Sequence, residues 1–174
     1  MALPKLSLVL GGAGSGKSVF AEGLVTATSF NPVYIATAQI WDSEMADKIA
    51  AHKAQRGPGW RTIEEPMAVE TALGGVCAGE AVLIDCATLW LTNLILSGAD
   101  VAAAEDRLFA ALAACPAPVI IVSNEVGMGI VPDNALARRF RGAQGGLNQR
   151  LAALADLAVM VIAGLPLVLK GRLP

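Results

Sequence analysis

The stretch "LSLVLGGAGSGKS", residues 6–18, decides the fold. It opens with a short continuous apolar run, which is typical of a strand buried on both faces. The next residues, GGAGSGKS, fit the pattern G-x-x-x-x-G-K-[ST]. Glycines let successive backbone amides turn toward a phosphate, and a helix beginning near Lys17 directs the positive end of its dipole to the same place. The stretch therefore predicts a site for a nucleoside triphosphate.

Each part of this phosphate loop has an expected role. Lys17 is predicted to reach the β and γ phosphates and to act in catalysis, and the Ser18 hydroxyl is predicted to ligate Mg²⁺. The residues expected to contact the nucleotide here are Gly11, Gly12, Ala13, Gly14, Ser15, Gly16, Lys17 and Ser18.

Further apolar runs alternate with helical patterns along the chain. The runs lie at residues 33–37, 81–85, 118–123 and 158–163, and residues 165–171 suit an edge strand. The helices are expected over residues 18–26, from Pro66, after Asp100, and from Asp133 toward Asp156 with a break at Gly145 and Gly146. This order predicts an α/β, P-loop NTPase-like three-layer sandwich with a mostly parallel central sheet, as one domain over residues 1–174. Ligands are then expected at the carboxyl ends of the strands.

Composition narrows the class of protein. The chain has 174 residues, 55% of them apolar, with 13 basic and 15 acidic residues and a net charge of −2. No overall field favours nucleic acid or an anionic membrane as a partner. The charge-free run 23–41 has polar residues and Pro32 in its middle, so we expect no membrane span and a cytoplasmic protein. Cys77, Cys86 and Cys115 are expected to be reduced core residues.

Two further strand ends carry candidate site residues. Asp85 follows the run 81–85 and is predicted to hold Mg²⁺ from a neighbouring strand, with a cap for the helix beginning at Ala87 as the alternative. The loop 123–133 places Asn124 and Glu125 at the same edge, where Glu125 is either a site residue or a surface carboxylate.

His52 is the one histidine of the chain. A helical stripe of Met45, Ile49, His52 and Arg56 favours a partly buried structural histidine. The positive charges of Lys53 and Arg56 favour a different role, because cations keep an imidazole neutral and stabilise charge on a phosphate leaving group. From the residues alone, both a structural and a nucleophilic histidine remain open.

Four long segments carry a family resemblance: GGAGSGKS (11–18), YIATAQIWDSEMADKIAAHKAQRGPGWRTIEEP (34–66), LIDCATLWLTNLI (83–95) and VSNEVGMGIVPDNALARRFRGAQGGLNQRLAALAD (122–156). Together they resemble the bifunctional adenosylcobinamide kinase/adenosylcobinamide-phosphate guanylyltransferase family of cobalamin biosynthesis. The resemblance implies phosphorylation of adenosylcobinamide with ATP or GTP. It then implies transfer of GMP from GTP to adenosylcobinamide phosphate through a guanylylated histidine, giving adenosyl-GDP-cobinamide and pyrophosphate.

The resemblance also implies site residues. The guanylylated histidine falls on His52. The rest of the GTP site falls on Ala36, Thr37, Ala38, Lys53, Ala54, Gln55, Arg56, Glu64 and Asp85. The chain departs from the family at Gly14, where relatives often carry Arg, and at Ala51, where some carry a second histidine; Asp85 is Glu in some relatives.

Two other functions compete with this one. The first is a P-loop small-molecule kinase without nucleotidyl transfer, in which His52 is structural; the second is a nucleotide-dependent switch. Four arginines resemble a phosphate-binding cluster, with solvated helix faces as the alternative: Arg138, Arg139, Arg141 and Arg150. The apolar segment 86–99 and the size of a corrinoid predict a homo-oligomer, a trimer by the resemblance.

Overall fold

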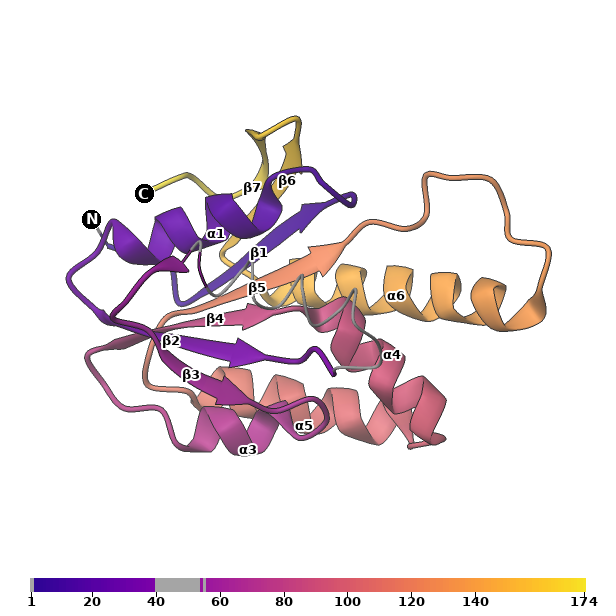
Figure 1. The fold of residues 1–174 in the computed structure, drawn as a ribbon, viewed down its shortest axis with the longest axis horizontal. Helices are drawn as coiled ribbons and strands as arrows, with labels where there is room; N and C mark the ends of the chain where they lie inside the picture. The colour runs from indigo at the N-terminus through magenta and orange to yellow at the C-terminus, as the bar shows by residue number, and fades with distance from the viewer. Residues whose placement is uncertain (1, 40–53, 55) are drawn as a thin grey trace.

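The protein is an α/β sandwich around a seven-stranded sheet, as the computed structural model of residues 2–39, 54 and 56–174 describes it (Figure 1). The strand order is β3-β2-β4-β5-β1-β6-β7, and every neighbouring pair is parallel except β6 with β7. The strands are β1 (Leu6–Gly11), β2 (Asn31–Ala36), β3 (Arg61–Glu64), β4 (Glu80–Asp85), β5 (Val119–Asn124), β6 (Leu157–Ile162) and β7 (Leu165–Lys170). The predicted fold class is confirmed.

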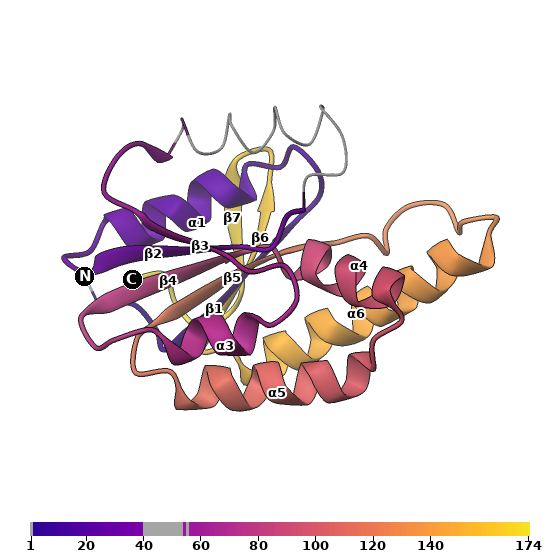
Figure 2. The same ribbon diagram turned by 60° about the horizontal axis from the view of Figure 1, so that its bottom comes forward.

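The described helices cover both faces of this sheet. Figure 2 shows α1 (Lys17–Thr26) on one face and the other four helices on the opposite face. Those four are α3 (Val69–Gly74), α4 (Ala87–Ser97), α5 (Val101–Ala114) and α6 (Ala135–Leu154). Among the residues that the structure describes, no helix is both long and apolar enough to cross a membrane.

The core lies in two apolar layers, one on each side of the sheet. Successive side chains of a strand point to opposite faces, so Val9 packs in the layer that includes Val25 of α1. Its neighbour Leu8 packs in the other layer, with Leu91 of α4 and Leu147 of α6. All six residues of β1 are buried. This central strand therefore gives the loop that follows it a rigid base.

One strand was missing from the sequence prediction. The predicted runs appear as β1, β2, β4, β5 and β6, and the predicted edge strand appears as β7. The missing strand is β3, which has four residues and pairs only with β2 at the edge of the sheet. Its sequence, RTIE, has no apolar run, because an edge strand with exposed side chains does not need one.

The expected break in the last helix was wrong. Helix α6 runs through Gly145 and Gly146 without interruption, and its N-cap is Asn134, not Asp133. The Asn134 side chain accepts a hydrogen bond from Ala137 N at 2.8 Å. Tertiary contacts of the buried side chains along this helix outweigh the low helix propensity of glycine.

The helix predicted from Pro66 begins three residues later, at Val69. The Glu65 carboxylate accepts hydrogen bonds from the backbone amides of Met67 (3.0 Å) and Ala68 (2.8 Å). Pro66 therefore lies in a turn that leads into α3, and not in the first turn of the helix.

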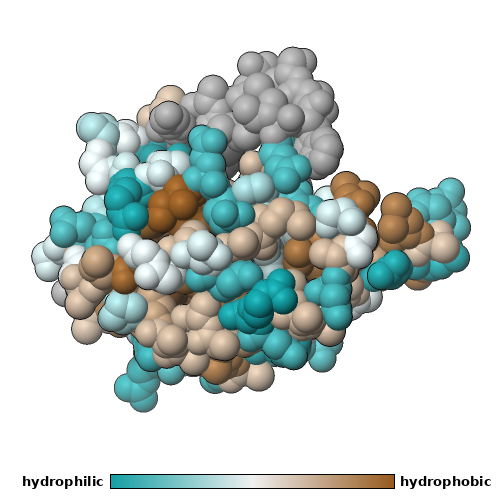
Figure 3. Space-filling model, turned by 90° about the horizontal axis from the view of Figure 1, so that it is seen from below, coloured by the Kyte–Doolittle hydropathy of each residue, from teal (hydrophilic) through white to brown (hydrophobic). Residues whose placement is uncertain are grey.

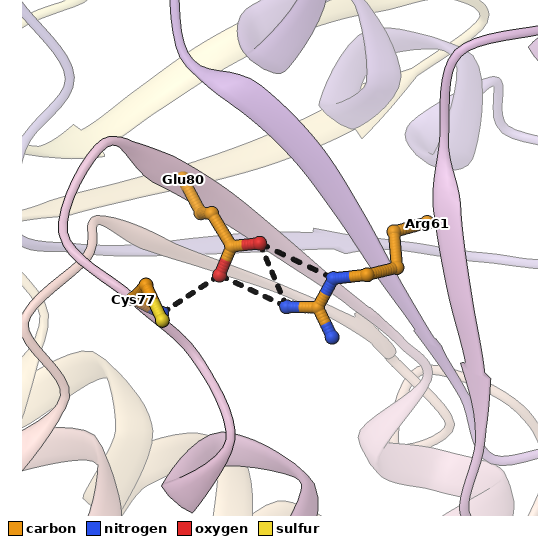
Figure 4. A network of polar contacts seen from close by, with 3 residues as sticks. All are labelled: Arg61, Cys77 and Glu80. Atoms are coloured by element: carbon orange, nitrogen blue, oxygen red, sulfur yellow. Dashed lines mark hydrogen bonds and ion pairs between the residues drawn. The ribbon is translucent and has the colours of Figure 1, made fainter.

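The cysteines are free thiols, as predicted, but only two belong to the core. Cys86 and Cys115 are buried, whereas Cys77 is exposed in the turn before β4. Figure 4 shows why this turn is ordered: Glu80 accepts from Cys77 N at 2.7 Å and pairs with Arg61 of β3 at 2.8 Å. These hydrogen bonds lower the pKa of Glu80, and the bond from the Cys77 amide has the largest effect.

The continuous α6 has a measurable consequence at Gly146, which is exposed and would have no atom within 4 Å of an added Cβ. In a helix interior, Gly146→Ala should raise the free energy of unfolding by about 0.5–1 kcal/mol. Gly98, with φ 74° at the end of α4, is the matched control, and Gly98→Ala should lower it by about 1 kcal/mol. Urea denaturation measures both, and a loss of stability in Gly146→Ala would contradict a continuous helix.

Candidate active site

The phosphate loop joins the end of β1 to the start of α1. Gly14 and Gly16 have φ angles of 69° and 89°, in the left-handed region that favours glycine. Gly16 is the N-cap of α1 and provides no side chain to cap the first amides of the helix. Those N–H groups and the helix dipole are therefore available to an anion in front of the helix.

The turn between β6 and β7 braces this loop from the side. Gly164 N donates to Ser15 O at 2.8 Å. A Cβ on Gly16 would lie 3.1 Å from Gly164 Cα, and one on Gly11 would lie 2.8 Å from Val161 O. The sequence did not predict that the turn at 163–164 belongs to the site. The one sequence signal for this turn is a glycine between two strand patterns.

Lys17 lies across the loop that it belongs to. Its Nζ donates to Gly12 O at 3.1 Å, so the ammonium group sits over the same curve of backbone whose amides face a phosphate. The Ser18 hydroxyl makes no hydrogen bond with another described residue. The roles that the motif gives to these two groups stay predictions.

Asp85 ends β4 and is held by an aromatic neighbour. Tyr34 donates its hydroxyl to Asp85 Oδ2 at 3.1 Å. The pKa of the Tyr34 phenol lies well above its usual range, because of burial first and the Asp85 carboxylate second, with Arg56 opposing them. The phenol therefore stays protonated and keeps donating to the carboxylate. Cys86, and not Asp85, is the N-cap of α4, so the alternative of a helix-capping Asp85 is wrong.

Arg56 contacts Tyr34, the residue that holds the Asp85 carboxylate. Its guanidinium carbon lies 3.4 Å from the centroid of the Tyr34 ring, a cation–π contact. Trp60 packs edge-on against the same ring, with 6.1 Å between centroids. Ala54 is described and exposed, whereas His52, Lys53 and Gln55 lie outside the described residues.

Three predicted site residues form a row across the carboxyl edge of the sheet. Ala36 pairs with Glu64 of β3 on one side and with Asp85 of β4 on the other. Thr37 follows directly and is fully buried. Its Oγ1 donates to Cys86 O at 2.8 Å and accepts from Cys86 N at 2.7 Å. The side chain of Thr37 thus locks the end of β2 to the end of β4, a positioning role that the sequence did not indicate.

The strand order separates Asp85 from the phosphate loop by one strand. β5 lies between β1 and β4, so Asp85 is not on a neighbouring strand as predicted, and two strand spacings amount to about 10 Å. Burial first, and then the Asp85 carboxylate, raise the pKa of Cys86 to about 12. Lys17 lies near enough to oppose this rise. Mg²⁺ usually keeps several water ligands, and these, with the two side chains and the phosphates, can bridge this distance.

The residues beside the loop are Asn124 and Glu125. Asn124 pairs in register with Gly11, and Glu125 N donates to Gly11 O at 3.2 Å. Asn124 Oδ1 is buried and accepts no hydrogen bond from any described residue. Glu125 is half-buried and accepts from Gly127 N, so it orders its own loop. The structure thus brings the loop 123–133 to the predicted edge.

The four arginines do not gather into one cluster. Arg150 pairs with Glu105 and with Asp106, the latter at 2.8 Å, which favours the alternative of a helix-face arginine over a place in a phosphate cluster. Arg138 and Arg141 lie together near the start of α6, and Arg139 is exposed with no side-chain bond to any described residue. A helix rises 1.5 Å per residue, which puts Arg150 about 14 Å beyond Arg141.

These features define a P-loop nucleotide-binding fold. Among solved structures, an ATPase from the type III secretion system of pathogenic bacteria matches with a TM-score of 0.56 and 13% identity, covering 97% of this chain and 57% of that one. At that identity, the match shows the fold alone.

The family follows from the sequence comparison. The family model "Cobinamide kinase / cobinamide phosphate guanyltransferase" matches residues 7–169, so the chain belongs to this family of transferases. A bifunctional adenosylcobalamin biosynthesis protein of Pseudomonas aeruginosa is 44% identical over 168 residues, with 95% of this chain and 97% of that protein covered. A bifunctional adenosylcobalamin biosynthesis protein of Salmonella typhimurium is 44% identical over 179 residues, with 94% of this chain and 98% of that protein covered. Such a protein of Escherichia coli is 41% identical over 179 residues at the same coverage.

The loop geometry predicts unequal effects at its two left-handed glycines. Gly16→Ala combines a left-handed backbone with a close approach to Gly164, whereas Gly14→Ala meets no atom within 4 Å. Both should lose about 1–2 kcal/mol from the strained backbone. We expect nucleotide affinity to fall by more than tenfold in Gly16→Ala and by less in Gly14→Ala, measured with a fluorescent GTP analogue. Gly23→Ala, in the open interior of α1, is the control; equal losses at positions 14 and 16 would contradict this account.

Proposed function

We propose that this chain phosphorylates adenosylcobinamide with ATP or GTP and then transfers GMP from GTP to adenosylcobinamide phosphate, giving adenosyl-GDP-cobinamide and pyrophosphate. The observation that carries the proposal is a complete phosphate loop in a chain whose family model, for both activities, matches residues 7–169. The curated relatives are named as bifunctional proteins of adenosylcobalamin biosynthesis, which supports two activities over a kinase alone.

In the first reaction, the acceptor hydroxyl oxygen attacks the γ phosphorus. A new O–P bond forms, the bond between the γ phosphorus and the β–γ bridging oxygen breaks, and the nucleoside diphosphate leaves with the electron pair, while the hydroxyl proton passes to water. Lys17 and the loop amides offset the charge that develops on the phosphates. The Lys17 ammonium group already lies over the loop, 3.1 Å from Gly12 O.

Ser18 and Asp85 would hold Mg²⁺ for this reaction. The residues fit the ion, since Mg²⁺ prefers oxygen ligands and combines one or two protein groups with phosphates. Asp85 uses Oδ2 for the Tyr34 hydroxyl and makes no other described side-chain hydrogen bond, and Ser18 makes none. When bound, the ion neutralises charge on the phosphate oxygens.

In the second reaction, a nitrogen of His52 attacks the α phosphorus of GTP. An N–P bond forms, the α–β bridging bond breaks and pyrophosphate leaves into the phosphate loop. An oxygen of adenosylcobinamide phosphate then attacks the same phosphorus, which breaks the N–P bond and returns the neutral imidazole. Because the loop holds the β and γ phosphates, the α phosphorus lies where a nucleophile from another element can approach it in line.

The position of Arg56 supports this role for His52. The two residues are four positions apart in sequence, and four extended residues span at most about 14 Å. Arg56 itself lies on the Tyr34 ring beside Asp85. Lys53 or Arg56 would neutralise charge on the transferred group. A cytoplasmic location, a single domain over residues 1–174 and a homo-oligomer stay predictions.

The histidine chemistry predicts a covalent adduct that can be trapped. With magnesium and GTP labelled at the α phosphorus, denatured wild-type protein should retain label that survives base and is released by acid, as expected of a phosphoramidate. His52→Ala should retain none, and GTP labelled at the γ phosphorus should label neither protein. Wild-type protein that takes up no α label would leave a P-loop kinase in which His52 only packs.

A further inference from the structure

A groove lies between the loop that follows β5 and the exposed side of α6. It measures about 420 Å³ and is lined by Gly127 and Val131 of the loop and by Arg138, Arg141, Gly142 and Gly145 of the helix. Figures 1 and 2 show this loop and the N-terminal half of α6 projecting beyond the carboxyl ends of the strands. The groove therefore opens at the edge of the sheet where ligands of α/β proteins bind.

Two arginines give the groove its charge. Arg138 Nη1 donates to Pro132 O at 3.0 Å and to Asp133 O at 2.6 Å, and Arg141 Nη2 donates to Gly127 O. These partners are all backbone carbonyls. Arg141 Nη1 is buried and has no partner among the described residues. A guanidinium has five N–H donors and prefers carboxylate or phosphate, so both side chains retain capacity for an anion.

Three of the other arginines are already paired with carboxylates, whereas the exposed Arg139 makes no side-chain bond to a described residue. Arg61 bonds Glu80, Arg107 bonds Glu70 and Arg150 bonds Glu105. The two arginines of the groove have no such partner in the described part of the chain, and no described carboxylate lines the groove with them. The difference points to an anionic ligand.

The floor of the groove is a helix face without side chains. A Cβ on Gly142, Gly145 or Gly146 would meet no atom within 4 Å, and none of these residues has a positive φ. Neither packing nor backbone geometry requires glycine here, although each glycine lowers helix stability by about 0.5–1 kcal/mol relative to alanine. Bare backbone suits a large ligand that lies flat against the helix.

Exposed apolar side chains of the loop beside the groove form what we call its rim, and of these Val131 lines the groove itself. Met128, Ile130 and Val131 are 82%, 97% and 66% exposed, respectively. In Figure 3, hydrophobic and hydrophilic residues lie side by side on the projecting end of the molecule. A ligand that covers this rim and also satisfies the arginines must combine a large apolar body with a negative group.

A buried amide network fixes the groove relative to the phosphate loop. Gln144 Nε2 donates to Ser123 Oγ at 2.9 Å, and Asn148 Nδ2 donates to Asn124 O at 3.1 Å, which ties α6 to the end of β5. Glu125 N in turn donates to Gly11 O at 3.2 Å. Gly127 is two residues further on, at most about 7 Å along the chain. The mouth of the groove therefore lies beside the nucleotide cradle.

We infer that this groove binds the phosphorylated acceptor of the guanylyl transfer, with Arg138 and Arg141 on its phosphate and Met128, Ile130 and Val131 against its macrocycle. The inference rests on the proposed function, which supplies an acceptor with both a corrin ring and a phosphate. A free anion would leave the apolar rim uncovered, and a neutral corrinoid would leave the guanidinium groups without an anion.

Equilibrium dialysis of the full-length protein with adenosylcobinamide phosphate, without nucleotide, tests the groove directly. Gly142→Leu fills the floor with a residue that favours helix, and Arg138→Gln removes one cation; each should raise the Kd at least tenfold. Arg139→Leu is the control, because it changes charge and bulk at an exposed neighbouring position outside the groove. It should leave the Kd within twofold.

Two further readings separate the possible failures. Trapping of α-labelled GMP needs no acceptor, so both groove variants should form the adduct as wild type does. If wild-type protein forms no adduct, the histidine step is refuted. The dialysis result then decides on the groove by itself. An unchanged Kd in both variants overturns the inference. Sedimentation that shows oligomers in wild type and monomers in both variants also overturns it, since the groove would then be an interface between copies. Should Gly142→Leu not fold, Arg138→Gln decides.

Discussion

The close packing of backbone around the phosphate loop is the constraint on which the rest of the site depends. The loop fits only because glycine stands at 11 and 16, where a Cβ would approach Val161 O and Gly164 Cα. The hydrogen bond from Gly164 N to Ser15 O ties it to the antiparallel β6–β7 hairpin. A backbone fixed on two sides keeps its amides directed at a phosphate without reorganising during the reaction, which is how such sites stabilise charge.

The carboxyl edge of the sheet extends this fixed frame toward the acceptor. The hydroxyl of Thr37 joins the ends of β2 and β4, and the Tyr34 hydroxyl holds Asp85. Asn148 and Gln144 hold α6 to the end of β5, the strand that leads into the loop 125–134. The phosphate loop, the Asp85 carboxylate and the groove are thus attached to three consecutive strands of one sheet, β1, β4 and β5, which suits two successive transfers at a shared edge.

The sequence predicted the parts of the structure that local patterns control. Buried strands and the phosphate loop follow from apolar runs and from glycine spacing, and both were correct. The strand order was not predictable from such patterns, so the β5 strand between Asp85 and the phosphate loop was missed. The glycines of α6 were interpreted as a break because their local propensity is low, whereas buried contacts along the helix decide. The roles of Thr37 and Gly164 depend on residues far away in sequence, and the one local signal among them is the glycine between two strand patterns at position 164.

The stereochemical course at the α phosphorus tests the central claim most directly. Each in-line displacement inverts the configuration, so transfer through His52 requires two inversions. With GTP that carries a chiral α-thiophosphate, the account predicts a guanylylated product with net retention of configuration. Net inversion would mean that the acceptor phosphate attacks GTP in a single step, and it would contradict a covalent intermediate on the histidine.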